Sequence, residues 1–167
     1  LQENCFIVME EATREAIIVD PGDDAPDIIA AVERLRARPT AIVNTHCHFD
    51  HVGAVNALTK HSGIPFYIHP DDEPLLNYAG LAAARWGLSV DQPQADRFIQ
   101  DGETIKVGNE TLEVRFAPGH APGHIVLVGD GFALVGDVLF AGSIGRFDLP
   151  GSDGPALMRS IQTQLLT

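Results

Sequence analysis

Apolar and polar residues follow two different spacings in the first 70 positions. Runs of apolar and β-branched residues predict strands at 4–9, 16–20, 40–43 and 64–68. Apolar residues three and four positions apart predict one helix over 25–38 and another from 52 to about 60. Because strands and helices alternate, this half of the chain is predicted to form βαβ units with right-handed crossovers.

The second half of the chain is organised differently. Residues 71–96 carry irregularly spaced apolar positions and predict only short helical pieces. After them, apolar stretches flank glycine-containing turns and predict hairpin strands at 104–107, 111–116, 125–128 and 132–135. A final helix is predicted from about residue 154 to the end. We expect residues 1–167 to form a single α/β domain that is incomplete at both ends, because residue 1 is Leu rather than Met, a strand is already predicted from residue 4, and the last predicted helix runs to residue 167.

The composition narrows the partners of this domain. Hydrophobic residues make up 45% of the 167 positions, which is typical of a globular protein. The formal net charge is −12, from 23 Asp and Glu against 11 Lys and Arg, and this argues against a nucleic-acid partner or an anionic membrane surface. No run approaches the roughly 20 apolar residues that span a bilayer. We therefore expect a cytoplasmic protein, in which Cys5 and Cys47 are reduced thiols rather than a disulfide.

The densest group of chemically active residues directly follows the predicted strand 40–43. Three histidines and a carboxylate fall within six positions: His46, His48, Asp50 and His51. Neutral imidazole nitrogens and carboxylate oxygens are preferred ligands of Zn²⁺ and similar metals. Loops that follow buried strands are also where α/β proteins usually place ligands. The sequence therefore predicts a metal site here, with Cys47 as a small loop residue rather than a ligand.

Two further candidates stand in the same context later in the chain. His120 follows the predicted strand 111–116 and lies between two Pro-Gly pairs. Asp137 closes the predicted strand 132–135 after Gly136. An aspartate in that position is often a turn former. With a metal cluster already predicted, ligation is the better interpretation of both residues.

Together these motifs resemble the metallo-β-lactamase superfamily. The shared features are the His-x-His-x-Asp-His run, the Pro-Gly-His after a hairpin, the Gly-Asp before Leu-Phe and the Asp-Pro-Gly turn at Asp20. The segments 119–124 and 142–148 are similar to glyoxalase II-like, or hydroxyacylglutathione hydrolase-like, proteins, especially their small bacterial members. The resemblance implies a four-layer αβ/βα sandwich, in which two mixed sheets are flanked by helices, with a binuclear metal site at one edge.

The resemblance also implies a division of the ligands between two divalent metals, most naturally Zn, with Fe or Mn as alternatives. It assigns three histidines to the first metal: His46, His48 and His120. It assigns Asp50 and His51 to the second metal, and it makes Asp137 the bridge between them. Asp50 takes a catalytic role as well, because it would orient the hydroxide shared by the two metals.

One feature of the superfamily has no counterpart in this sequence. A final histidine usually completes the second metal, but no histidine follows His124 here. We expect the chain to be truncated before that residue, and the second metal to lack one protein ligand.

Three residues near the predicted ligands are given supporting roles. Asp20 is expected to orient the ligand loop through hydrogen bonds. His124 is expected to support the site without ligating, with a surface histidine as the alternative. Arg146 matches a basic residue that contacts glutathione in glyoxalase II-like proteins, and it would bind a substrate carboxylate. The alternative for Arg146 is an ion pair with Asp148.

The function implied by the resemblance is hydrolysis of thioesters such as S-lactoylglutathione by a metal-bridged hydroxide. The expected partner is accordingly a small-molecule thioester, with a glutathione-linked one as the example. A second hypothesis is a persulfide dioxygenase-like oxidoreductase with one iron held by His46, His120 and Asp137. A third is a non-catalytic metal-binding module, which the missing final histidine would fit.

Overall fold

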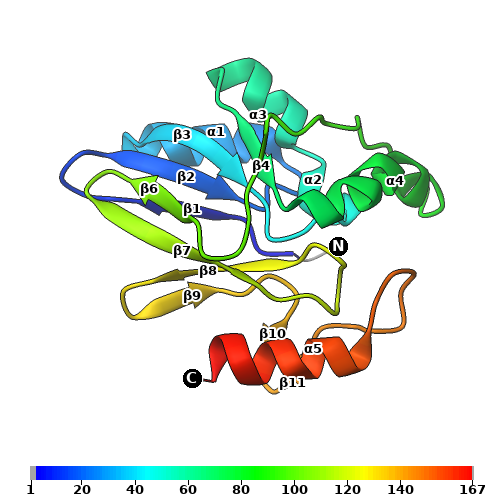
Figure 1. Ribbon diagram of the computed structural model, residues 1–167. Helices are drawn as coiled ribbons and strands as arrows, with labels where there is room; N and C mark the ends of the chain where they lie inside the picture. Colours follow the sequence, from blue (N-terminus) through cyan, green and yellow to red (C-terminus); the bar gives the residue numbers. More distant parts are fainter. Residues whose placement is uncertain (1–2, 167) are drawn as a thin grey trace.

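The computed structural model describes residues 3–166, in which two main sheets pack face to face (Figure 1). The first sheet has the strand order β1-β2-β3-β4-β5: β1 (Phe6–Met9), β2 (Glu15–Val19), β3 (Arg38–Val43), β4 (Phe66–Ile68) and β5 (Arg97–Phe98). β1 pairs antiparallel with β2, and the other three pairings are parallel. This sheet is therefore mixed, as expected of strands joined by helical crossovers.

The second sheet is antiparallel throughout the described residues and has the order β6-β7-β8-β9. Its strands are β6 (Thr104–Val107), β7 (Glu110–Phe116), β8 (Ile125–Gly129) and β9 (Phe132–Leu134). A separate small hairpin follows, formed by β10 (Leu139–Phe140) and β11 (Ser143–Ile144). The loops between β7 and β8 and between β9 and β10 carry the downstream candidate ligands.

Helices cover the outer face of each sheet (Figure 1). The first sheet is covered by α1 (Ala25–Leu35), α2 (Phe49–Val52), α3 (Val55–Ser62) and α4 (Glu73–Ala84), which follows the short helix η1 (Pro70–Asp72). The second sheet is covered by α5 (Gly154–Ser160), which continues as the π-helical turn η2 (Ile161–Leu165). The order of layers is helix, sheet, sheet, helix, which confirms the predicted four-layer αβ/βα sandwich.

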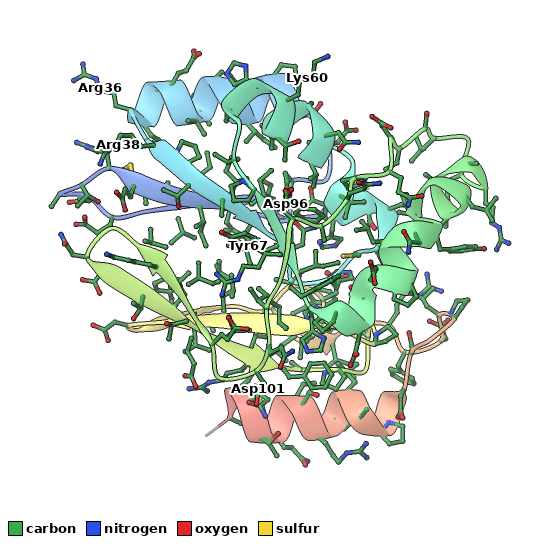
Figure 2. All side chains as sticks on the ribbon, turned by 45° about the horizontal axis from the view of Figure 1, so that its top comes forward. Arg36, Arg38, Lys60, Tyr67, Asp96 and Asp101 are labelled. Carbon is green, nitrogen blue, oxygen red and sulfur yellow. The ribbon has the colours of Figure 1, made fainter. Side chains whose placement is uncertain are left out.

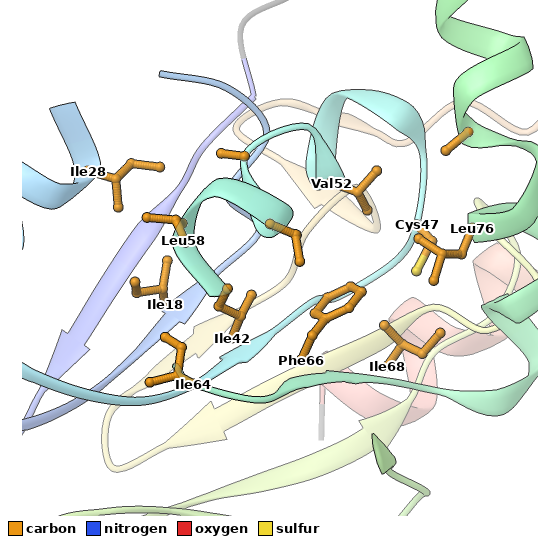
Figure 3. Packing of buried hydrophobic residues seen from close by; sticks show 13 residues of the cluster. Ile18, Ile28, Ile42, Cys47, Val52, Leu58, Ile64, Phe66, Ile68 and Leu76 are labelled. Carbon is orange, nitrogen blue, oxygen red and sulfur yellow. The ribbon is translucent and has the colours of Figure 1, made fainter. Parts of the chain in front are cut away.

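Alternate residues of each central strand face different layers. Ile18 of β2 packs with helix residues such as Ile28 and Leu58 (Figure 3), whereas Ile17 and Val19 pack against the second sheet. Ile17, Ile18 and Val19 are all buried, because both faces of β2 are covered, so the strand reads as a continuous apolar run. On the other side of the sandwich, apolar side chains of α5 bury the outer face of β8.

The structure differs from the sequence-based elements mainly at their ends. The helix predicted over 25–38 ends at Leu35, because Arg36 adopts a left-handed conformation (φ 53°) and the next strand already begins at Arg38. The helix predicted from residue 52 is divided into α2 and α3. The two-residue strands β5, β10 and β11 were not predicted, since they are too short to show an alternation. Among the described helices, none is both long and apolar enough to cross a membrane.

Candidate metal centre

Three loops at one edge of the sandwich meet to form the candidate metal centre. The loop after β3 carries His46 and His48, and it leads directly into α2. The loop from β7 to β8 carries His120, and the loop from β9 to β10 carries Asp137. The first two loops are joined where the Ile125 N–H donates to the Thr45 carbonyl (2.8 Å). Residues more than 70 positions apart are thus fixed beside one another.

Three histidines of these loops point their nitrogens at a common space. One ring nitrogen each of His46, His48 and His120 lies within 4.8 Å of the other two. Nδ1 of His48 and Nε2 of His120 are only 2.9 Å apart. Two nitrogens this close attract each other only if one of them carries a proton and the other accepts it. If neither carries a proton, both lone pairs can bind a cation between the rings. Three neutral nitrogen donors are one of the ligand sets found in catalytic zinc sites.

The tautomers of these rings agree with ligation. Nδ1 of His120 lies 2.8 Å from the Arg146 carbonyl, so it carries the proton and leaves the Nε2 lone pair free. Nδ1 of His46 lies 3.2 Å from Thr45 Oγ1. Nε2 of His46 is buried and has no hydrogen-bond partner in the described structure. A buried polar atom without a partner is costly, and a bound metal would satisfy it.

The protonation of the three rings is also favourable for metal binding. Burial, together with the neighbouring histidines, lowers the pKa of His46 well below its usual value. The same causes lower the pKa of His48 to about 3. Burial also lowers the pKa of His120, against the opposing effect of Asp137. All three imidazoles are therefore neutral at pH 7, which is the form that binds a metal.

The residues assigned to a second metal lie next to this group. Nε2 of His51 is 3.7 Å from Asp137 Oδ1, and Nε2 of His120 is 3.4 Å from Asp137 Oδ2. The Asp137 carboxylate thus stands between the three-histidine group and His51, where a bridging ligand would be. Asp50 is partly buried in the first turn of α2, and its charge acts on His51. The assignment of these residues to a second metal stays a prediction.

Asp20 lies under the ligand loop, in contact with three groups of it. Its oxygens accept the Thr45 N–H (2.7 Å) and the Thr45 hydroxyl (2.6 Å), and Oδ2 is 3.3 Å from Nδ1 of His51. Burial alone would lower the pKa of His51, but the contact with Asp20 and the charge of Asp137 raise it to about 9. Asp20 adopts a left-handed backbone conformation (φ 51°) that few residues other than glycine tolerate. These contacts hold both the loop and the His51 ring in place.

His124 is fully buried, and its ring stacks on His46 with centroids 4.8 Å apart. Its Nε2 accepts the backbone N–H of Asp137 (3.1 Å). This hydrogen bond uses the Nε2 lone pair and fits the predicted supporting role, which stays a prediction. The preceding Gly136 (φ 48°) has no room for a side chain, since a Cβ there would overlap Thr45 and His124.

Arg146 contributes to the site through its backbone, where it accepts the His120 N–H. Its exposed guanidinium makes two hydrogen bonds to Asp148, Nε to Oδ1 at 2.9 Å and Nη2 to Oδ2 at 3.1 Å. The pairing with Asp148 that the sequence left open is therefore present in this structure. Substrate binding by Arg146 stays a prediction. Cys5 and Cys47 are both free thiols, and the Cys47 side chain points from the ligand loop into the core.

Two buried residues that support the ligand loops were missed in the sequence. The Asn44 amide donates to the backbone carbonyls of His51 (2.7 Å) and His46 (3.3 Å). Asp72 accepts backbone N–H groups from two loops of the site. The only available signal was their position, since both follow parallel strands of the first sheet, at the same edge as the predicted ligands.

This chain belongs to the metallo-beta-lactamase superfamily, whose family model matches residues 1–167. Proteins of this class are metal-dependent hydrolases. The three-histidine group, with His51 and Asp137 beside it, is the candidate for the metal centre of this class.

Individual relatives cover nearly the whole chain. The hydroxyacylglutathione hydrolase GloC of Haemophilus influenzae is 38% identical, over 99% of this chain and 80% of its own. The solved structure of TTHA1623 in a di-iron-bound form is 40% identical with a TM-score of 0.88, over 97% of this chain and 80% of its own. The BLEG-1 B3 metallo-beta-lactamase is 34% identical with a TM-score of 0.90, over 99% and 81%.

Proposed function

We propose that this protein hydrolyses thioesters of small molecules, such as S-lactoylglutathione, with two divalent metals at the candidate centre. The observation that carries the proposal is the position of the Asp137 carboxylate, 3.4 Å from His120 and 3.7 Å from His51. A carboxylate between two groups of ligands suits a pair of cations better than a single one. The 38% identity to a hydroxyacylglutathione hydrolase supports the thioester as substrate.

The residues of the chain divide the work as follows. His46, His48 and His120 would hold one cation, and His51 with Asp50 the other, while Asp137 faces both. Cations bound there would supply an activated water and a Lewis acid for the substrate carbonyl. Asp20 keeps the His51 ring in one orientation, and the Arg146 carbonyl keeps Nε2 of His120 unprotonated. Asp50 would accept a hydrogen bond from the attacking water and so orient it.

A cavity of about 280 Å³ opens beside His51 and Asp137 and offers space for the substrate. Its walls include the apolar side chains of Leu134, Leu139 and Phe140. An acyl group can rest against these residues while its carbonyl lies at the ligands. The leaving thiol has a pKa near ~8.5, so a thiolate departs at neutral pH without a strong proton donor. The reaction therefore does not require Arg146, whose guanidinium is hydrogen-bonded to Asp148, to assist the leaving group.

One further candidate function has an observation in its favour. A relative with 40% identity was solved in a di-iron-bound form, so a centre of this kind accepts iron. A dioxygenase-like oxidoreductase with one iron on His46, His120 and Asp137 is therefore the second candidate. It would leave His51 and Asp50 without a role at the metal, which is why we place it second. A non-catalytic metal-binding module is the third hypothesis.

The test is metal reconstitution followed by a small substrate panel. The purified protein is loaded with Zn²⁺, Mn²⁺ or Fe²⁺, and metal content is measured together with turnover of S-lactoylglutathione, a small neutral thioester and a β-lactam. Oxygen uptake with a glutathione persulfide is measured in parallel. We expect two metals per chain and preferential thioester hydrolysis. One iron with oxygen uptake would favour the oxidoreductase, and metal binding without any turnover would favour the binding module.

A further inference from the structure

Asp72 is completely buried at the junction of η1 and α4, close to the candidate metal centre. Aspartate at the start of a helix usually caps the helix by accepting one of its free N–H groups. Asp72 stands at that position of α4, but its side chain makes no capping hydrogen bond. Helix capping therefore does not explain why an aspartate is buried at this position, and its carboxylate must have another role.

Both oxygens of this carboxylate are used by the loops that carry the histidines. Oδ2 accepts the N–H of Cys47 (2.5 Å), which lies between His46 and His48. Oδ1 accepts the N–H of Gly123 (2.7 Å), in the loop that carries His120. One rigid side chain is thus hydrogen-bonded to the two loops that supply the three nitrogen ligands. Figure 1 shows why it can reach both, because α4 begins beside α2, at the site edge of the sandwich.

We propose that Asp72 is a positioning residue, which fixes the distance between the two histidine loops and thereby sets the geometry and affinity of the three-histidine metal site. This inference rests on the metal centre of the proposed function and not on the identity of the substrate.

Besides the contact between the His48 and His120 rings, two hydrogen-bonded links join these loops within the described residues. The first link is the hydrogen bond from the Ile125 N–H to the Thr45 carbonyl. Asp72 supplies the second connection, so the loops are held at two points rather than hinged at one. Gly123 packs so closely on the Asp72 backbone that a Cβ there would overlap it. The loop that carries Gly123 is therefore already in close contact with Asp72, and position 123 has no room for a side chain.

A carboxylate suits this position better than its amide. It offers two acceptors to two N–H donors, which arrive from opposite loops. In Asp72→Asn, one of the two donors would face an amide NH₂ and lose its partner in a buried place. The loop opposite the NH₂ would move away, and the nitrogen atoms of His48 and His120 would separate with it.

The experiment compares Asp72→Asn with the matched control Asp96→Asn. Asp96, labelled in Figure 2, accepts the Phe66 N–H (2.8 Å) and so makes the same kind of carboxylate-to-backbone bond away from the ligand loops. The probe is Co²⁺, whose visible absorption reports coordination geometry. Its affinity is measured by competition with a chelator, and urea unfolding of the metal-free proteins reports their stability.

We expect Asp72→Asn to bind Co²⁺ about 10- to 100-fold more weakly than the unchanged protein, the range for residues that orient metal ligands. Its absorption spectrum should change as well, whereas Asp96→Asn keeps both affinity and spectrum. If Asp72→Asn does not fold, Asp72→Glu replaces it, because it keeps two acceptors and lengthens the side chain by one methylene. A changed spectrum is expected for that variant too.

Wild-type affinity and spectrum in the folded Asp72 variant would overturn the inference and leave the metal centre standing. An equal loss in Asp96→Asn would overturn it as well, since the effect would then be general destabilisation. If the unchanged protein itself binds no Co²⁺, the proposed centre is wrong, and the inference falls with it.

Discussion

The two halves of the candidate centre are built from different chemistry. The half formed by His46, His48 and His120 consists of neutral imidazoles whose pKa values are lowered by burial. The half around His51 contains carboxylates, and in the metal-free protein the pKa of His51 is raised to about 9. A cation entering the first half displaces no proton at neutral pH, whereas one entering the second must displace the proton of His51. We therefore expect the centre to bind two metals with unequal affinity.

The largest expected effect comes from removing a ligand of the first half. His120→Ala removes one of the three nitrogen ligands and the ring beside Asp137. The affinity for metal should therefore fall by more than about 100-fold, which is the upper range for residues that only support ligands. The fold should persist, because its core lies between the layers and not at the site. Metal content and circular dichroism check this, with His61→Ala on the exposed surface of α3 as the control. Full metal content in His120→Ala would show that the ligand assignment is wrong.

The pH dependence of metal binding should distinguish the halves next. In the metal-free folded protein His51 stays protonated up to a pH of about 9, whereas its usual pKa, that of the unfolded chain, is 6.5. Each pH unit in that range should therefore strengthen binding of the second Zn²⁺ about tenfold, since one proton is released. Binding of the first Zn²⁺ should change little, because His46 and His48 are already neutral. Competition titrations with a chelator at pH 6.5 to 9 measure both affinities. An equal pH dependence of the two affinities would contradict the proposed difference between the halves.

The same proton predicts the stability of the metal-free protein. A folded pKa above the unfolded one stabilises the protein fully below pH 6.5, and this stabilisation is lost as the pH rises through about 9. In Asp20→Asn the carboxylate that faces His51 is absent, so the pH dependence in this window should flatten. Loss of a charged hydrogen-bond acceptor for Thr45 should also cost about 1–3 kcal/mol at pH 7. Urea unfolding across the pH range checks both expectations, and an unchanged pH dependence would contradict the role of Asp20.

The smallest expected effect is that of Arg146→Ala. Its guanidinium is exposed and paired with Asp148, so stability should barely change. If the side chain exchanges Asp148 for a substrate carboxylate, KM for a glutathione thioester should rise a few-fold while KM for a small neutral thioester stays the same. Steady-state kinetics on the two substrates decide this. An equal change in KM for both substrates would contradict substrate binding by Arg146 and leave the ion pair with Asp148 as its role.

The parts of the fold that the sequence predicted are those with a local pattern. The apolar runs of β2 and β3 and the hairpins of the second sheet follow from spacing alone. The run from His46 to His51 was equally visible, since its chemistry is concentrated in six positions. Asp72 was not visible, because its role depends on the N–H groups of Cys47 and Gly123, which lie 25 and 51 positions away. The short strand β5 depends likewise on a partner, β4, and not on its own two residues.

Chelator titration of the Zn²⁺-loaded 167-residue chain measures directly whether the centre holds two metals with unequal affinity. Bound zinc and thioester hydrolysis are followed together as the chelator concentration increases. We expect zinc to leave in two steps, and hydrolysis to be lost in the first step, when the half around His51 loses its ion. Release of both ions in one step, or full hydrolysis after one ion has left, would contradict this expectation.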